Sequence, residues 1–399
     1  MKADDETRLR LSVCLIIKNE ERWLNQCLAS IQPVADEIIV VDTGSTDTSC
    51  EIAERYGAKI FHFSWCDDFS QARNFSLEKA TASWVLILDA DEVIAEKDYD
   101  TLRSLTGTPA RTPAACQILT RNYINRNDII GWRANDNSYA DKEHGCGWIP
   151  SIKTRLWSNH PEIRFSYPVH EVVTPALKKL SLEPQTCSIV IHHYGKLNQL
   201  QADAKGKRYF AIGLKKLADM SDAELPLREL AIQAGILKRF DEAIDLWQRY
   251  LKIKPDNAEA WLNLGTALFS TGKIDAALDA AKKATKLAPD LKEIHFNHAL
   301  YELHLGRSKE AAKRLRALIK IVPEYHAAKF MHAAAVCCRD GNKKGRKAFN
   351  KIIGKNLTEE MIAIAGKELA LTLAGAGRHK DAEKIEKAAQ WLSDNKKPR

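Results

Sequence analysis

The sequence predicts an α/β domain with a doubly wound, mostly parallel sheet, followed by an all-α array of repeats. Two observations support this fold class. Strand-like and helix-like segments alternate through the first hundred residues, which is the βαβ order of a parallel sheet. After about residue 224, proline and alanine recur at an interval of 34 residues, which indicates stacked helix pairs.

The elements of the first domain follow from apolar patterning. Continuous apolar runs predict strands over 11–17, 37–41, 58–63 and 84–88. Apolar residues at helical spacing predict helices over 20–31 and 69–79, and the turn residues 43–47 begin a helix that reaches about residue 56. Because the carboxyl ends of parallel strands meet at one crevice, we expect Asp42 and Asp89 to face it together.

The fourth strand runs directly into Asp89, Ala90, Asp91 and Glu92. Two aspartates at positions i and i+2 can both reach one divalent cation, with phosphate oxygens filling the remaining positions. The residues alone therefore predict a metal-bound phosphate compound at the edge of the sheet.

The periodicity weakens between about residues 98 and 196, where Trp, Asn, Gly and His are frequent. Loop-rich segments of this composition usually form a binding surface or a lid. The alternative is a poorly packed connection. Trp132, Trp148 and Tyr167 are candidates to stack on a bound ligand, and otherwise are core or lid aromatics.

The C-terminal part is a repeat array. Pro255, Pro289 and Pro323 share the 34-residue interval, as do three alanines that precede them, Ala243, Ala277 and Ala311. This pattern matches the tetratricopeptide repeat, with 261–265 as its clearest element. Three units span roughly 224–325, and two degenerate units follow at 326–358 and 359–392. The array predicts a superhelical stack with a concave groove that binds peptides or a neighbouring domain.

Charge is distributed unevenly along the 399 residues, whose net charge is +8. Residues 1–200 carry 22 Lys and Arg against 27 Asp and Glu, and the remainder carries 38 against 25. A basic half can meet nucleic acid, an anionic membrane or an acidic partner. The basic residues are scattered along helical faces without interleaved aromatics, which argues against nucleic acid and favours a solvated surface.

Cellular location is predicted from three further features. No apolar run approaches the length of a membrane span, and residues 1–10 are too charged for a secretory signal. The nine cysteines lack paired metal spacing and are interpreted as buried free thiols of a reduced cytosol. We therefore expect a cytoplasmic protein, with peripheral membrane contact through the basic repeats as an option.

Four motifs of the first half resemble family 2 glycosyltransferases, which have the Rossmann-like A-type fold. They are 17–20, 41–47, 72–74 and 89–92, in this order. The resemblance implies a tail (1–10), a transferase domain (11–200) with a nucleotide-sugar half (11–97) and an acceptor or lid half (98–200), a linker helix (201–223), the repeats (224–392) and a basic tail (393–399).

Motifs later in the sequence indicate which branch of the family the chain resembles. Segments 152–157, 169–171 and 192–195 are similar to the branch that contains lipooligosaccharide-core glucosyltransferases, and glycosyltransferases of glycopeptide bacteriocins have a similar arrangement. Lys196 departs from this pattern, because an aromatic residue more usually follows the His-Tyr-Gly motif.

The resemblance also implies roles for individual residues. Asn19 and Glu20 would face the base and ribose, as would Asp42, whose carboxylate can accept a hydrogen bond from uracil or ribose. Helix capping is their structural alternative. Arg73 would contact the pyrophosphate or orient a carboxylate, or it forms an ordinary ion pair.

The acidic cluster and the later motifs complete the implied site. Asp91 would bind Mn²⁺ or Mg²⁺ directly, with Asp89 and Ala90 nearer the nucleotide sugar and Glu92 as a helix cap. His193 is the candidate for a further metal ligand, or a satisfied structural histidine. Glu171 is the candidate base that takes a proton from the acceptor.

Three hypotheses remain open from the sequence. The first is an inverting, metal-dependent transfer of a hexose from a UDP-hexose to a surface glycan of lipooligosaccharide type. The second keeps this chemistry but uses a peptide or protein acceptor held by the repeats. The third is a repeat-based scaffold whose sheet domain binds nucleotide only weakly.

Overall fold

The computed structural model describes residues 10–107, 112–127, 131–197, 199–218, 223–354 and 357–394. It divides the chain into two compact units, residues 1–219 and 220–399. Of the predicted tails and linker, residues 1–9, 219–222 and 395–399 lie outside the described residues.

The first unit is built on a nine-stranded sheet. Its strands are, in chain order, β1 (Leu11–Ile17), β2 (Glu37–Asp42), β3 (Lys59–His62), β4 (Trp84–Ile87), β5 (Glu92–Ile94), β6 (Ala115–Ile124), β7 (Arg133–Ala134), β8 (Gly147–Ser158) and β9 (Gln185–His193). The order in the sheet is β3-β2-β1-β4-β8-β6-β9-β5, and β7 pairs with β8.

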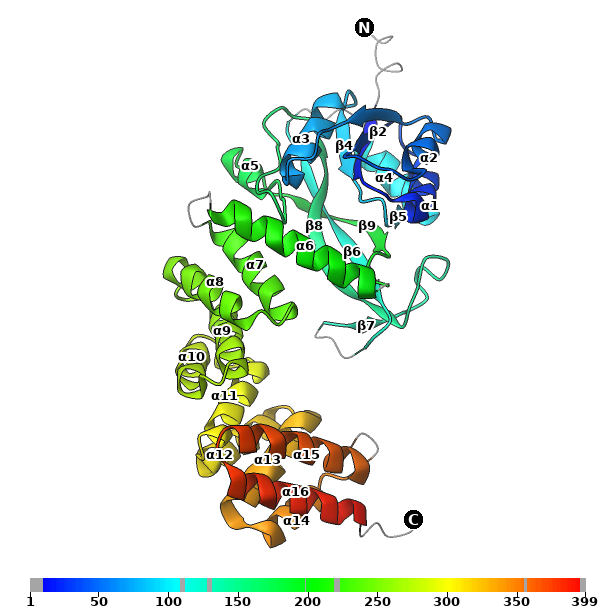
Figure 1. Ribbon diagram of the computed structural model, residues 1–399. Helices are drawn as coiled ribbons and strands as arrows, with labels where there is room; N and C mark the ends of the chain where they lie inside the picture. The colour runs from blue at the N-terminus through cyan, green and yellow to red at the C-terminus, as the bar shows by residue number, and fades with distance from the viewer. Residues whose placement is uncertain are drawn as a thin grey trace. The chain divides into compact units, whose positions relative to one another are not determined.

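The first four strands are mutually parallel, as the apolar runs predict. Helices cover both faces of this part of the sheet (Figure 1), which is why β2 and β4 are buried along their whole length. One face packs against α1 (Glu21–Ile31), α2 (Ser49–Arg55) and α4 (Tyr99–Thr106), and the other against α3 (Phe69–Lys79) and α5 (Thr174–Lys179). The predicted α/β class is confirmed.

Beyond β4 the sheet is mixed. Strand β8 is antiparallel to β4 and β6, β9 is parallel to β6, and β5 is antiparallel to β9. The prediction of a loop-rich segment between residues 98 and 196 is therefore wrong for these long strands. Polar residues such as Arg121, Asn122 and Arg155 interrupt their apolar pattern because these side chains line the candidate site or anchor a loop.

Helices α6 (Gln199–Ala218) and η1 (Glu96–Asp98) also belong to the first unit. Most of α6 falls in the range 201–223, where a linker helix is predicted, and the helix belongs to the first compact unit. Phe210 of α6 is fully buried, and Tyr209 contacts Phe69 at the start of α3 with ring centroids 4.7 Å apart. This packing explains why the helix is part of the compact unit.

The second unit consists of helix pairs. In chain order they are α7 (Glu224–Ile236) with α8 (Phe240–Ile253), α9 (Ala258–Ser270) with α10 (Ile274–Leu287), α11 (Lys292–His304) with α12 (Ser308–Ile321), α13 (His326–Asp340) with α14 (Asn342–Asn350), and α15 (Glu359–Gly375) with α16 (His379–Asp394).

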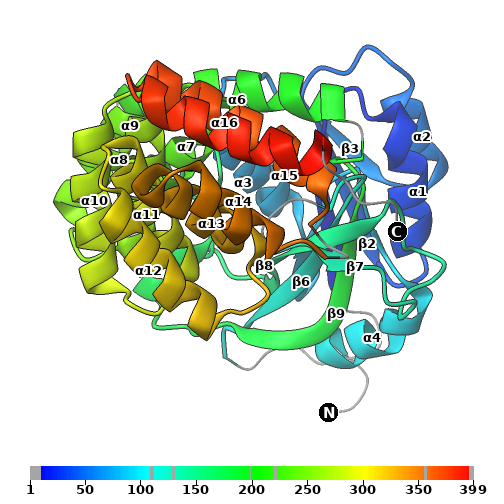
Figure 2. The same cartoon turned by 90° about the horizontal axis from the view of Figure 1, so that it is seen from below.

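The first helices of neighbouring pairs contact one another, α7 with α9, α9 with α11 and α11 with α13 (Figure 2). Ala243, Ala277 and Ala311 are fully buried at equivalent positions, where a small side chain lets two helices approach closely. The predicted repeat architecture is confirmed.

Two further observations concern the described residues. None of their helices is both long and apolar enough to cross a lipid bilayer. All nine cysteines are free thiols, and Cys66 and Cys146 are exposed, so the expectation that the thiols are buried holds only in part.

Candidate active site

The residues identified in the sequence lie along one edge of the sheet. Asn19 and Glu20 follow β1, Asp42 ends β2, and Asp89 and Asp91 follow β4. Because β1, β2 and β4 are parallel neighbours, their carboxyl ends meet at this edge.

The carboxylate of Asp42 is buried and is held by the turn after β2. It accepts hydrogen bonds from the backbone N–H groups of Gly44 (3.1 Å) and Ser45 (3.0 Å), and Nδ1 of His62 lies 3.4 Å away. Burial by itself raises the pKa of Asp42, but the hydrogen bonds from Ser45, Gly44 and His62 outweigh it and hold the pKa below its ordinary value. Asp42 thus fixes the turn and still has lone pairs for another donor.

The turn after β1 is tied to the same loop. Asn19 has a positive φ of 55°, its N–H donates to Ser45 Oγ (3.0 Å), and its side-chain oxygen accepts from the Thr46 N–H (2.7 Å). The Glu20 N–H donates to Ser49 Oγ (2.8 Å). The two turns therefore form one hydrogen-bonded platform.

Arg73 of α3 connects two carboxylates from distant parts of the chain. Its Nη2 donates to Asp89 Oδ1 (2.5 Å) and its Nε donates to Glu171 Oε1 (2.7 Å). Burial opposes the charge of Arg73, but Asp89 and Glu171 outweigh it and raise the pKa of the guanidinium. Arg73 therefore forms ion pairs with both carboxylates, and whether it also contacts a pyrophosphate stays a prediction. Nη1 is buried and has no hydrogen-bond partner within the described residues.

The acidic turn after β4 is balanced by a second arginine, Arg155 of β8. Its Nη2 donates to Glu92 Oε1 (2.8 Å) and lies 3.4 Å from Asp89 Oδ2. Glu92 in turn accepts a hydrogen bond from the Asp89 N–H (2.9 Å). Burial raises the pKa of Asp89, but Arg73 and Arg155 outweigh it and hold that pKa well below its ordinary value. Glu92 therefore fixes the turn and does not cap a helix, since β5 follows.

Asp91 lies beside His193. Its Oδ2 is 3.3 Å from His193 Nε2, and both side chains are largely buried. His193 Nδ1 is 2.8 Å from the side-chain oxygen of Asn122, whose amide group donates to Ile149 O (3.0 Å) and is thereby oriented. An oxygen acceptor at Nδ1 places a ring proton there. Burial lowers the pKa of His193, but the charge and the hydrogen bond of Asp91 outweigh it and raise that pKa, so Nε2 can bind a metal ion only once its own proton has left.

Gly195 leaves space beside these two atoms. A Cβ at this position would lie 2.1 Å from Asp91 Oδ2 and 2.8 Å from His193 Nε2. Two adjacent ligands of one hard cation are about 3 Å apart, so the pair has a suitable separation. No group of three or more His, Cys, Asp or Glu side chains suited to a metal ion occurs within the described residues. Asp91 and His193 fit as two ligands of an ion that takes its others from a bound phosphate compound and water.

Glu171 is carried by a hairpin loop. Ser166 and Val172 exchange backbone hydrogen bonds at its base, and Phe69 N–H of α3 donates to Pro168 O (2.8 Å). Tyr167 and His170 both have positive φ in this loop, 77° and 58°. The loop brings Glu171 to Arg73, whose Nε donates to Oε1 of the carboxylate.

The remaining candidates lie elsewhere. The Ala90 methyl group is buried in the core, so only its backbone can face a ligand. Trp148 is buried beneath the guanidinium of Arg121 and contacts Tyr123 and Tyr194, which makes it a core aromatic. Trp132 is half-buried, and its Nε1 has no partner within the described residues.

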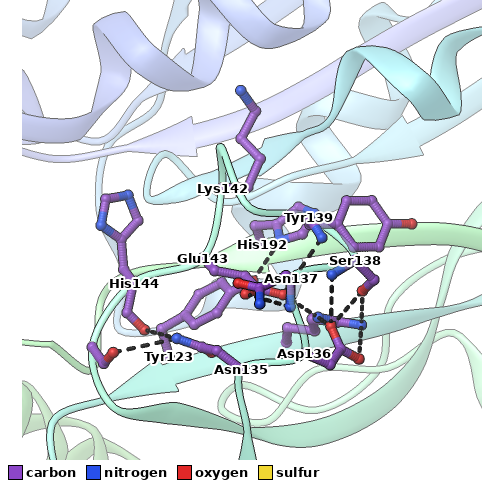
Figure 3. Close-up of polar contacts among 12 residues, drawn as sticks. Tyr123, Asn135, Asp136, Asn137, Ser138, Tyr139, Lys142, Glu143, His144 and His192 are labelled. Atoms are coloured by element: carbon purple, nitrogen blue, oxygen red, sulfur yellow. Dashed lines mark hydrogen bonds and ion pairs between the residues drawn. The ribbon is translucent and has the colours of Figure 1, made fainter.

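The polar-aromatic segment 135–144 is anchored to the sheet (Figure 3). Arg121 of β6 donates to Asp136 and Glu143, both at 3.1 Å. Tyr123 OH lies 2.8 Å from Nδ1 of His192, a buried histidine whose pKa burial lowers to about 3. The neutral ring of His192 therefore has a structural role beneath this segment, in contact with Tyr123.

Sequence reasoning missed three residues that organise the site, Asn122, Arg155 and Gly195. Arg155 and Gly195 lie in motifs that the family resemblance includes, but their contacts depend on β8 and β9, which no apolar pattern predicts. Asn122 has no signal in a single sequence.

Comparisons with known proteins agree with this division of the chain. Residues 12–156 match the model of Glycosyl transferase family 2, and residues 237–292 match a Tetratricopeptide repeat model. A TPR repeat-containing protein of Synechococcus elongatus is 36% identical over 193 residues, which are 47% of this chain and 42% of that protein.

Two similar glycosyltransferases match shorter stretches. An uncharacterized glycosyltransferase of Rickettsia typhi is 35% identical over 91 residues, 23% of this chain and 31% of that protein. The SPbeta prophage-derived glycosyltransferase SunS of Bacillus subtilis is 35% identical over 86 residues, 21% of this chain and 20% of that protein. The chain thus spans less than half the length of each of these relatives.

These matches place Asp42, Asp89 and Asp91 within the part of the chain that is similar to glycosyl transferase family 2. The first unit therefore carries a domain of glycosyl transferase family 2, and the second unit carries tetratricopeptide repeats.

Proposed function

We propose that the chain is an inverting, divalent-metal-dependent hexosyltransferase that uses a UDP-hexose and a surface-glycan acceptor of lipooligosaccharide type. The observation that carries this proposal is the pairing of Asp91 with His193 beside the space at Gly195. Next to it, Arg73 joins Asp89 to the proposed base Glu171. The proposed location is the cytoplasm, with the basic repeats available for peripheral contact with an anionic membrane.

On the donor side, this chain's residues bind and orient the nucleotide. Asn19, Glu20 and Asp42 contact uracil and ribose from the platform after β1 and β2. The buried Nη1 of Arg73, which has no partner within the described residues, donates to a phosphate oxygen. Mn²⁺ or Mg²⁺ held by Asp91 and His193 supplies positive charge where negative charge develops on the departing UDP.

On the acceptor side, Glu171 takes the proton of the attacking hydroxyl through Oε2 while Arg73 holds Oε1 in place. The acceptor oxygen forms a bond to C1 of the sugar as the bond from C1 to the phosphate oxygen breaks. The proton moves to Glu171 and the electron pair leaves with UDP. Attack opposite the leaving group inverts the configuration at C1.

Release of UDP from UDP-glucose tests the donor half of the proposal in the full-length chain. We expect Mn²⁺-dependent release that chelation abolishes, and a loss of more than about a hundredfold in Asp91→Ala, because metal stabilisation of a leaving group contributes several kcal/mol. The control is Asp100→Ala, whose side chain is 98% exposed at the start of α4. Full turnover in Asp91→Ala would refute the proposal.

A second candidate is transfer to a peptide or protein, which the tetratricopeptide repeats favour because such arrays bind extended peptides. Parallel trials with a lipooligosaccharide core and with peptide libraries separate the two acceptors. Calorimetry with UDP and Mn²⁺ tests the scaffold alternative: an absence of metal-dependent binding would favour a scaffold over either transferase.

A further inference from the structure

The fourth helix pair of the repeat unit is irregular. Helices α8, α10 and α12 begin at residues 240, 274 and 308 and each contain 14 residues. Helix α14 begins at the next position of this series, 342, but ends after nine residues at Asn350. A segment that is irregular over its described residues, 351–354 and 357, follows, and in it Gly354 and Leu357 exchange backbone hydrogen bonds of 3.0 and 3.3 Å.

The missing helical turns leave a cavity of about 780 Å³ between α12, α13, α14 and this segment. Its floor is apolar and consists of buried or half-buried side chains, namely Ile319, Val336, Ala348, Ile352, Ile353 and Leu357. A cavity of this size accommodates a bulky apolar side chain together with its neighbours.

Cations surround the apolar floor. They come from all three helices and the irregular segment, and comprise Arg316, Lys320, Lys329, Lys344, Lys347 and Lys351. Lys344 lies 3.5 Å from Asp340. The other five form no ion pair among the residues that the structure describes, and Glu324 is the acid that lines the cavity. The charge of the rim is therefore largely uncompensated.

The wall of the cavity also contains an unsatisfied polar atom. Nε2 of His332 is buried and has no hydrogen-bond partner in the described part of the chain. Burial, and then the charges of Arg316 and Arg339, lower the pKa of His332, so its ring is neutral at physiological pH. The His332 ring therefore adds no charge to the wall of the cavity.

We propose that this cavity binds an acidic peptide segment that carries a bulky apolar anchor residue. The anchor occupies the apolar floor, and flanking Asp and Glu side chains meet the five unpaired cations of the rim. A flat anionic bilayer would reach the rim but not the recessed floor, so the geometry favours a peptide over a membrane. This site is independent of the proposed transfer reaction.

The test is fluorescence anisotropy of the full-length chain with a labelled Asp- and Glu-rich peptide that contains a central Leu-Trp pair. We expect saturable binding that weakens with salt. The same peptide with Gly-Gly in place of Leu-Trp should bind at least about tenfold more weakly, since a buried anchor contributes more than 1.4 kcal/mol.

Variants locate the binding. Lys320→Glu with Lys347→Glu should reduce affinity by at least about tenfold. Lys286→Glu with Lys313→Glu is the matched control, because these exposed lysines occupy the same positions one repeat earlier, away from the cavity. Ala348→Trp, which fills the cavity and keeps every cation, should also weaken binding. Circular dichroism confirms that each variant remains helical.

Three results would overturn the proposal. One is equal binding of the peptides with and without the Leu-Trp pair. Another is an equal effect of the Lys286/Lys313 and Lys320/Lys347 variants. The third is binding to phosphatidylserine vesicles without saturable binding of the peptide, which would assign the basic rim to a membrane surface.

Discussion

Arg73 neutralises two carboxylates of the candidate site. Its guanidinium is buried and contacts Asp89 and Glu171 through different nitrogen atoms. A planar group with several donors can serve two carboxylates at once, whereas an ammonium group is a point charge that cannot reproduce this geometry.

Arg73→Lys should therefore keep the charge but lose the connection between Asp89 and Glu171. We expect kcat/KM for sugar transfer to fall by about a hundredfold, because Glu171 is no longer held in place. The melting temperature should fall as well, since a buried carboxylate loses a partner. Arg103→Lys is the control, because the Arg103 side chain is 54% exposed. Unchanged activity in Arg73→Lys would contradict this role.

The space beside Gly195 allows a second prediction, which concerns the metal dependence of UDP release. In Gly195→Ala the new methyl group overlaps Asp91 Oδ2 and crowds His193 Nε2. We expect the Mn²⁺ concentration for half-maximal UDP release to rise by at least about tenfold, with a stability loss of about 1–3 kcal/mol. Gly235→Ala is the control, because a Cβ there meets no atom within 4 Å. A normal metal response in Gly195→Ala would argue against a metal ion at this position.

Some residues of the candidate site can be predicted from the sequence and others cannot. Asp42, Asp89 and Asp91 are predictable because each follows or ends a strongly apolar strand, and parallel strands fix where their ends meet. Glu171 and His193 depend on a family resemblance. Asn122 lies near the carboxyl end of β6, and its role comes entirely from the pairing of β6 with β9, which brings it opposite His193.

At the scale of elements, the sequence predicts those strands correctly that are buried on both faces of the sheet. Strands β1, β2 and β4 are covered on both faces, so their sequences are mostly apolar, whereas β3 lies at the edge of the sheet with Lys59 and His62 exposed. Strands β6 and β8 carry polar residues toward the site and toward segment 135–144, and β6 shifts its register against β8 between Cys116 and Gln117. Because of these features, β6 and β8 show neither the regular apolar–polar alternation nor the continuous apolar run from which strands are predicted.

The helices of the repeat unit allow a matched test of close packing. Ala277 is fully buried in α10, whereas its neighbour Ala276 is exposed. Ala277→Leu should destabilise the second unit by about 1–3 kcal/mol, because extra methyl groups do not fit a close helix contact. Ala276→Leu makes the same chemical change in the same helix and should alter stability by less than about 0.5 kcal/mol. Urea unfolding of both variants measures the difference, and equal effects would refute the packing argument.

At the scale of the molecule, each unit has its own hydrophobic core. Calorimetry of the full-length chain should therefore resolve two unfolding transitions. UDP with Mn²⁺ at about a hundred times the dissociation constant should stabilise the first unit by about 2.7 kcal/mol, or roughly 5–10 °C. The transition of the repeat unit should not move. A shift of both transitions would show that the units unfold together.

The shared guanidinium of Arg73 has a consequence for how the sequence of the first unit can change. A change at position 73, 89 or 171 alone removes at least one ion pair of the buried Arg73 guanidinium, so substitutions at the three positions constrain one another. We therefore expect amino-acid substitutions at these three positions to accumulate slowly. New acceptor preferences should arise through substitutions outside this triad, in the hairpin around Glu171, in segment 135–144 and in the repeats, where a lineage can accumulate them one at a time.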